Sequence, residues 1–234
     1  MERIELSVAD GTKMAAHVAR PPASGWKTPG IIVFQEAYGV NSHIRDVAQR
    51  FAGLGFTAIA PELFHRTAPG FEGSYSDSES IRPHMAALTN DGLIADVHAA
   101  YEWLSHEDMV DAGRLAAIGF CMGGRVAYLA NGSVNLRAAI SFYGGGIAPA
   151  LLSFAEKQRG ALLMFWGGRD QHIAPEQYRA VADALTIAGK THEQVVFSQA
   201  DHGFFCDQRP SYDAGSARQA WMLTQEFLRV FGVF

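Results

Sequence analysis

The sequence predicts an α/β fold with a mostly parallel sheet of about eight strands and helices on both faces. Short apolar runs rich in β-formers alternate with helical patterns, and this alternation is typical of a parallel sheet covered on both faces. The opening of the chain differs. Residues 4–8 and 14–19 are separated by Ala9-Asp10-Gly11-Thr12, a turn-forming segment that favours an antiparallel hairpin. No internal repeat or second core is visible, so residues 1–234 are expected to form a single domain.

The strands after the hairpin are predicted from apolar runs. A linker with proline and glycine over residues 21–29 leads to residues 30–34, an unbroken apolar run expected of a buried strand. Further runs of this kind, bounded by polar or turn-forming residues, predict strands over residues 56–60, 115–118, 138–142, 162–166 and 194–197.

The helices are predicted from apolar residues three or four positions apart. Asn41 or Ser42 can cap the first helix, which Gly55 is placed to end. The same spacing predicts helices over residues 90–104, 123–130, 175–188 and 217–230. Residues 63–80 contain glycine, proline, serine and acidic residues without periodicity. We expect them to form an irregular surface excursion of the kind that often borders a site.

The bulk composition argues against several classes of function. The formal net charge is −5 and the pI is about 6.0, so the chain has no basic field to bind a nucleic-acid backbone. The longest apolar runs are far shorter than the roughly 20 residues that cross a bilayer. The first residues lack the pattern of a secretory signal. We expect a cytoplasmic protein, with no nucleic-acid or membrane partner, in which Cys121 and Cys206 are free thiols rather than a disulfide.

A nucleophile elbow is the clearest catalytic motif. The strand predicted over residues 115–118 runs into Gly119-Phe120-Cys121-Met122-Gly123, and a helical pattern starts at once. This G-x-C-x-G pattern is the elbow of α/β-hydrolases, with cysteine where serine is commoner. The elbow exposes its central side chain at a helix N-terminus, which favours a thiolate. A buried cysteine is otherwise an ordinary small hydrophobe, but the flanking glycines favour a nucleophile.

An acid and a base follow the elbow in the order that α/β-hydrolases use. Asp170 comes after the apolar run 162–166, and His202 lies in the loop after residues 194–197. An imidazole moves protons near neutral pH, and a carboxylate fixes its tautomer. Asp170 has an alternative role as a cap of the helix that Pro175 opens. Asp201 is the rival acid, but adjacent residues rarely face one another productively, so Asp170 is preferred.

These motifs, together with Gln35-Glu36-Ala37-Tyr38-Gly39 and Asp201-His202-Gly203-Phe204, make the chain similar to the dienelactone hydrolase family, or carboxymethylenebutenolidases, over nearly its whole length. The resemblance implies the α/β-hydrolase fold and cleavage of a carboxylic ester or lactone without cofactor or metal. It implies a triad of Cys121, His202 and Asp170, an oxyanion hole from the N–H groups of Ala37 and Met122, and a Glu36 carboxylate that contacts the resting thiol. The substrate contacts expected in this way are Tyr38, Arg82, Tyr143, Phe204 and Cys206.

The sequence departs from the family where a substrate carboxylate is bound. The well-studied members have an arginine four residues after the histidine and another in the excursion. Cys206 occupies the first of these places, and Arg82 matches the second only approximately. A weaker preference for anionic substrates is therefore expected, unless Arg125 or Arg209 substitutes; both residues are also typical solvated surface cations.

Two classes of function are consistent with a reactive cysteine. The first is a hydrolase of a small ester or lactone, acting as a monomer or homodimer through an acyl-enzyme. The second is a redox-active or ligand-binding protein in which Cys206 resolves an oxidised Cys121. His202 and Asp170 distinguish the two, because redox chemistry does not require them.

Overall fold

Eight strands form one sheet in the computed structural model, which describes residues 1–23 and 25–234. Residue 24, within the predicted linker over residues 21–29, lies outside the described residues. The strand order is β1-β2-β4-β3-β5-β6-β7-β8. β1 and β2 form the antiparallel hairpin, β2 also pairs antiparallel with β4, and the other pairs are parallel. The strands are β1 (Glu2–Ser7), β2 (Lys13–Ala19), β3 (Thr28–Phe34), β4 (Thr57–Pro61), β5 (Val110–Phe120), β6 (Ala138–Phe142), β7 (Ala161–Gly167) and β8 (His192–Phe197). The predicted fold class is thus confirmed.

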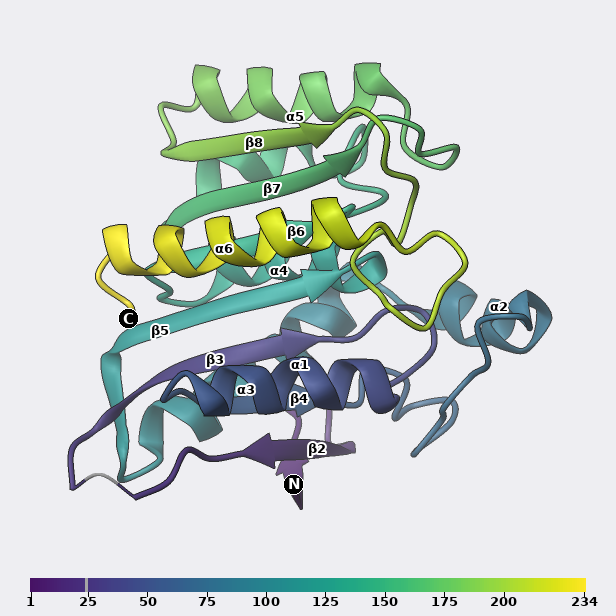
Figure 1. The fold of residues 1–234 in the computed structure, drawn as a ribbon. Coiled ribbons are helices and arrows are strands. Elements are labelled where there is room, and N and C mark those ends of the chain that lie inside the picture. The colour runs from purple at the N-terminus through teal and green to yellow at the C-terminus, as the bar shows by residue number, and fades with distance from the viewer. Residues whose placement is uncertain (24) are drawn as a thin grey trace.

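Helices cover both faces of the sheet, with α6 in front and α4 behind it in Figure 1. α1 and α6 share one face, where the ring centroids of Phe51 and Trp221 are 4.9 Å apart. α3 packs against α4 on the other face. Asn41 caps α1 as expected, because its side chain accepts a hydrogen bond from the backbone N–H of Ile44 at 3.2 Å. The helices are α1 (Ser42–Gly53), α2 (Ser78–Ala87), α3 (Asn90–His106), α4 (Met122–Ser133), α5 (Pro175–Ile187) and α6 (Ala214–Val230).

The excursion after β4 is partly helical, which corrects the expectation of a wholly irregular segment. α2 begins within it and extends to residue 87, and its N-terminus is capped by Asp77, which accepts hydrogen bonds from the N–H groups of Glu79 and Ser80. The helix has no fully buried residue and contains Pro83. It therefore lacks the apolar stripe by which a helix is recognised in sequence. A short 3₁₀ helix, η1 (Leu152–Lys157), was also not expected.

The carboxyl ends of the parallel strands lie along one edge of the sheet, and this edge positions the site. Figure 1 shows the loops after β5, β7 and β8 gathering at this edge, with α2 beside them. The central strands are buried on both faces, so they form a rigid support for these loops. Along the described part of the chain, no helix is both long and apolar enough to cross a bilayer.

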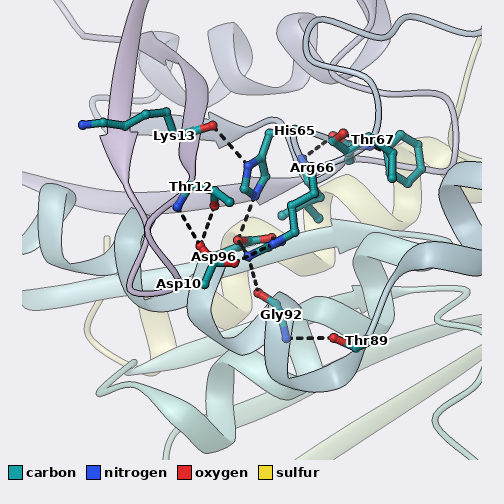
Figure 2. A network of polar contacts seen from close by, with 12 residues as sticks. Asp10, Thr12, Lys13, His65, Arg66, Thr67, Thr89, Gly92 and Asp96 are labelled. Carbon is teal, nitrogen blue, oxygen red and sulfur yellow. Dashed lines mark hydrogen bonds and ion pairs between the residues drawn. The ribbon is translucent and has the colours of Figure 1, made fainter.

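A buried carboxylate connects the N-terminal hairpin to the rest of the fold (Figure 2). Asp96 of α3 is fully buried and accepts two hydrogen bonds from Arg66, at 2.8 and 2.9 Å, in a bidentate pair. It also lies 3.1 Å from His65 Nε2. Arg66 Nε donates in turn to Asp10 in the β1–β2 turn at 2.7 Å. Because a buried charge is costly unless it is paired, this network holds hairpin, excursion and α3 together.

Candidate active site

The elbow joins β5 to α4 and has the strained geometry that the motif predicts. Cys121 adopts φ 55° and ψ −117°, a region that L-residues rarely occupy. Its N–H donates to the carbonyl of Phe142 at 3.0 Å, which holds the turn against β6. A Cβ on Gly119 would collide with the carbonyl of Gly123, and one on Gly123 would collide with the carbonyl of Phe34. The close packing of the turn thus requires both glycines.

Asp170 and His202 meet from the loops after β7 and β8. His202 Nδ1 lies 2.7 Å from Asp170 Oδ2, and the other carboxylate oxygen accepts the N–H groups of His172 at 2.7 Å and Ile173 at 3.1 Å. The carboxylate is therefore held by backbone donors while it orients the imidazole. His202 and Cys121 line the same cavity, and the sulfur interacts electrostatically with the imidazole. Because Nδ1 faces Asp170, Nε2 is the nitrogen that is left to exchange a proton with the sulfur.

Burial and hydrogen bonding act in opposite directions on this pair. Burial disfavours a charged imidazole, but the interactions with Asp170 and Cys121 outweigh it and raise the pKa of His202 to about 10. Burial also opposes charge on Asp170, yet its bonds to His202 and to backbone N–H groups lower the pKa of its carboxyl. These interactions favour the protonated form of His202 near neutral pH. A cationic imidazole and a helix N-terminus are the two surroundings that generally make a cysteine a better nucleophile.

Two backbone donors are available beside Cys121. Ala37 follows β3 and Met122 is the first residue of α4, and both line the cavity that contains Cys121. Within the described residues, neither backbone N–H has a hydrogen-bond partner. Unpaired donors beside a nucleophile are the arrangement that stabilises an oxyanion as it forms.

Glu36 is fully buried next to the site, and both of its carboxylate oxygens are hydrogen-bonded. Oε1 accepts from Arg209 at 3.1 Å, and Oε2 accepts from the hydroxyl of Tyr75 at 2.8 Å. In this conformation the carboxylate therefore binds Arg209 and Tyr75 rather than the thiol of Cys121. A side chain on Gly203, which has φ 81°, would overlap the guanidinium of Arg209. The glycine after His202 thus makes room for the partner of Glu36.

The cavity above Cys121 has a volume of about 300 Å³, the size of a small-molecule site. Larger surface cavities, of about 470 to 680 Å³, lie elsewhere and contain neither Cys121 nor His202. We assign the site to the smaller cavity because the reactive groups are there. Its polar and charged lining residues are Tyr38, Arg125, His172, His202 and Arg209, and α2 contributes Ile81 and Met85.

The structure separates the expected substrate contacts into two groups. Tyr38 lines the cavity, whereas Tyr143, Phe204 and Cys206 are fully buried and are not part of its lining. The ring of Tyr143 packs against that of His202, with the two ring centroids 5.0 Å apart. Arg82 is about three-quarters exposed, pairs with Glu79 and also lies outside the lining. Arg125 and Arg209, named only as substitutes, are the two arginines at the cavity.

Some residues of the site have no local signal in the sequence. Tyr75, Ile81 and Met85 come from the excursion and α2, where no periodicity marks a buried face. His172 follows the acid by two residues, and its ring lies 5.0 Å from that of His202. Its position two residues after Asp170, in the loop that follows β7, is the only signal that could have indicated it.

The sheet topology, the elbow and the hydrogen-bonded histidine define the protein as an α/β-hydrolase. A model of the dienelactone hydrolase family matches residues 14–232. The chain belongs to the dienelactone hydrolase family, and the predicted class, a carboxylic ester hydrolase, is confirmed.

Individual relatives match this chain along nearly its full length and theirs. A Synechocystis protein, provisionally named a carboxymethylenebutenolidase, is 36% identical over 226 residues, which are 93% of this chain and 92% of the relative. A Bradyrhizobium protein, provisionally named a 2-oxo-3-(5-oxofuran-2-ylidene)propanoate lactonase, is 28% identical over 94% of this chain and 90% of its own. A crystal structure from Klebsiella pneumoniae, provisionally named a dienelactone hydrolase, superposes with a TM-score of 0.88 at 31% identity, covering 97% of this chain and 98% of the other.

Proposed function

We propose that this protein hydrolyses a carboxylic ester or lactone through Cys121, with an acyl-enzyme intermediate. The observation that carries the proposal is the Asp170–His202 hydrogen bond of 2.7 Å next to a cysteine in a strained elbow. The strained backbone of Cys121 costs free energy. Strain of this kind persists where the surrounding structure requires it, most often at active sites. A structural cysteine would need neither the elbow nor the ordered imidazole.

The reaction follows from the geometry. The sulfur of Cys121 attacks the carbonyl carbon, and the N–H groups of Ala37 and Met122 bind the resulting oxyanion. The intermediate collapses to a thioester, and the departing alkoxide takes a proton from His202. His202 then removes a proton from water, the hydroxide attacks the thioester, and the acid leaves as the thiolate is restored. Asp170 keeps the imidazole in its working tautomer throughout.

The charges at the cavity favour a substrate that carries an anion. Glu36 pairs with Arg209 and neutralises its charge. Arg125 differs, because burial lowers the pKa of its guanidinium and no carboxylate among the described residues pairs with it to offset that shift. Within the same residues, Arg125 Nε has no hydrogen-bond partner. A half-buried guanidinium of this kind is suited to a carboxylate. The Bradyrhizobium relative is named for a lactone of a 2-oxo acid, which also carries a carboxylate.

The redox alternative is less well supported. Cys206 is fully buried, and burial raises the pKa of its thiol to about 11. A resolving cysteine needs access and thiolate character, and Cys206 lacks both. Both cysteines are free thiols in this structure, in agreement with the expectation from sequence.

The test is to trap the acyl-enzyme. Mixing the protein with excess aryl acetate and quenching during the first turnover should add one acetyl group to Cys121, detected by intact-protein and peptide mass spectrometry. His202→Ala should lower kcat by at least about a hundredfold. His172→Ala is the matched control. The ring of His172 also borders the cavity, but only the backbone N–H of this residue bonds to Asp170, and the substitution keeps that N–H. Turnover by Cys121→Ala at the wild-type rate would refute the proposal.

A further inference from the structure

A buried histidine without hydrogen-bond partners lies close to the loop that carries His202. His43, the second residue of α1, is 1% exposed, and among the described residues neither of its ring nitrogens has a hydrogen-bond partner. Its ring is held edge-on by Phe120 and Phe205, with ring centroids 5.8 and 6.1 Å away. Buried polar groups in native proteins are nearly always paired. This imidazole is therefore a candidate ligand-binding group.

Two more donor atoms face the imidazole from the following part of the loop. The ring nitrogen of His43, the thiol sulfur of Cys206 and a carboxylate oxygen of Asp207 all lie within 4.8 Å of one another. His43 Nδ1 is 3.8 Å from Asp207 Oδ1, which is too long for a hydrogen bond. Cys206 is fully buried and Asp207 is about half exposed. The cluster therefore opens to solvent on the carboxylate side.

We propose that His43, Cys206 and Asp207 form a binding site for a divalent transition-metal ion of the zinc type, separate from the catalytic triad. Imidazole, thiolate and carboxylate are the ligand types that zinc takes, and tetrahedral coordination leaves a fourth position for water. Magnesium and calcium prefer all-oxygen sites, so they do not match this set. On binding, the metal–sulfur bond replaces the S–H bond of Cys206, and the proton goes to solvent.

The geometry requires only small adjustments. Ligand atoms around a tetrahedral zinc ion lie about 3.3 to 3.5 Å apart, given metal–ligand bonds of roughly 2.0 to 2.3 Å. The three atoms must therefore approach one another by about 1.5 Å or less, and the exposed side chain of Asp207 can supply most of this movement. The loop is already fastened to α1, because the hydroxyl of Ser42 donates to the side chain of Gln208 at 3.0 Å. The two buried ligands are thus preorganised.

The site has a physical connection to the active centre. The thiol of Cys206 interacts electrostatically with Tyr75, whose hydroxyl donates to Glu36 at 2.8 Å. A metal ion on the sulfur would thus lie two side chains from the carboxylate beside the nucleophile. It would also bridge α1 to the loop that carries His202.

Cobalt(II) is the probe, because a cobalt–thiolate bond absorbs in the near ultraviolet and identifies sulfur as a ligand. The catalytic pair Cys121 and His202 could also bind a metal, so the full-length Cys121→Ser protein is the background. We expect it to bind one Co²⁺ with a thiolate charge-transfer band that Zn²⁺ abolishes by displacement. Adding Cys206→Ser should remove the band.

A pair of charge-matched variants separates ligation from long-range attraction. Asp207→Asn should weaken Co²⁺ binding by about tenfold or more, as the loss of a metal-site residue does. Asp46→Asn removes an equal charge that also acts on His43, but its carboxylate lies outside the cluster, so affinity should change less than about twofold. Both residues are about half exposed, so neither change threatens folding. No band in the Cys121→Ser protein, a band that survives Cys206→Ser, or equal effects of the two aspartate variants would overturn the proposal.

Discussion

Arg125→Gln tests whether the cavity reads a negative charge on the substrate. The guanidinium is half-buried at the cavity, donates to the side-chain oxygen of Asn90 and has no acidic partner among the described residues. Glutamine keeps a polar side chain and a similar stem but removes the charge and the fork. The variant should therefore lose recognition of an anionic ester while it retains turnover of a neutral ester.

The size of the loss follows from the bond that is removed. A hydrogen bond to a charged group contributes about 1.5 to 3 kcal/mol, which corresponds to a roughly ten- to hundredfold change in kcat/KM. Arg209 should contribute less than Arg125 to a substrate carboxylate, because Glu36 already binds it at 3.1 Å. We expect most of the preference to depend on Arg125.

The assay compares kcat/KM for two aryl esters that differ by one carboxylate, 4-nitrophenyl butyrate and the mono-4-nitrophenyl ester of succinate. Arg125→Gln should lower the ratio of anionic to neutral ester by roughly ten- to a hundredfold. Arg82→Gln is the matched control, because this arginine is about three-quarters exposed and lies outside the cavity lining. An unchanged ratio in Arg125→Gln, or an equal fall in Arg82→Gln, would refute the reasoning.

Three further predictions concern the thiols, pH and the buried network. Iodoacetamide at neutral pH should alkylate Cys121 well before Cys206, whose pKa burial raises to about 11; peptide mass spectrometry checks this, and the reverse order would contradict it. The pKa of His202 is raised in the folded state, so its stabilisation, at most about 5 kcal/mol, is complete below the unfolded pKa and is lost as the pH rises to about 10. The Tm difference between wild type and His202→Gln should therefore shrink from pH 6.5 to pH 10; a widening gap would show the opposite sign. Asp96→Ala should lower the free energy of unfolding by about 3 kcal/mol in urea, since it leaves Arg66 and His65 without their buried acceptor. Asp10→Ala, at the exposed end of the same network, should cost less than about 1 kcal/mol, and equal losses would contradict this account.

Local patterns in the sequence were enough for the fold and for the core of the site. The strands were predictable because buried parallel strands need unbroken apolar runs, and each predicted run lies within a strand or overlaps it closely. The elbow was predictable because a side chain on either glycine would collide with nearby backbone. Gly119 lies against Gly123, four residues along the chain, and Gly123 lies against the end of the neighbouring β3. The carboxyl ends of parallel strands share one edge, so the order of Cys121, Asp170 and His202 along the chain also predicted that they would meet.

The partners of these residues depend on the tertiary structure. Glu36 and Arg209 are 173 positions apart, and no spacing rule relates them. Arg82 looked like the better match for a substrate contact, yet α2 directs it to Glu79 and solvent, while the first turns of α4 bring Arg125 to the cavity.

The sequence by itself therefore determined the sheet, the elbow and the chain order of Cys121, Asp170 and His202, because each depends on short-range sterics or on the burial of a single element. Only the tertiary structure decided which charges face the cavity, which carboxylate pairs with Arg209, and that His43 meets Cys206 and Asp207. Long side chains reach across loops whose paths are set by packing against distant elements, and that packing leaves no periodic signal in the sequence.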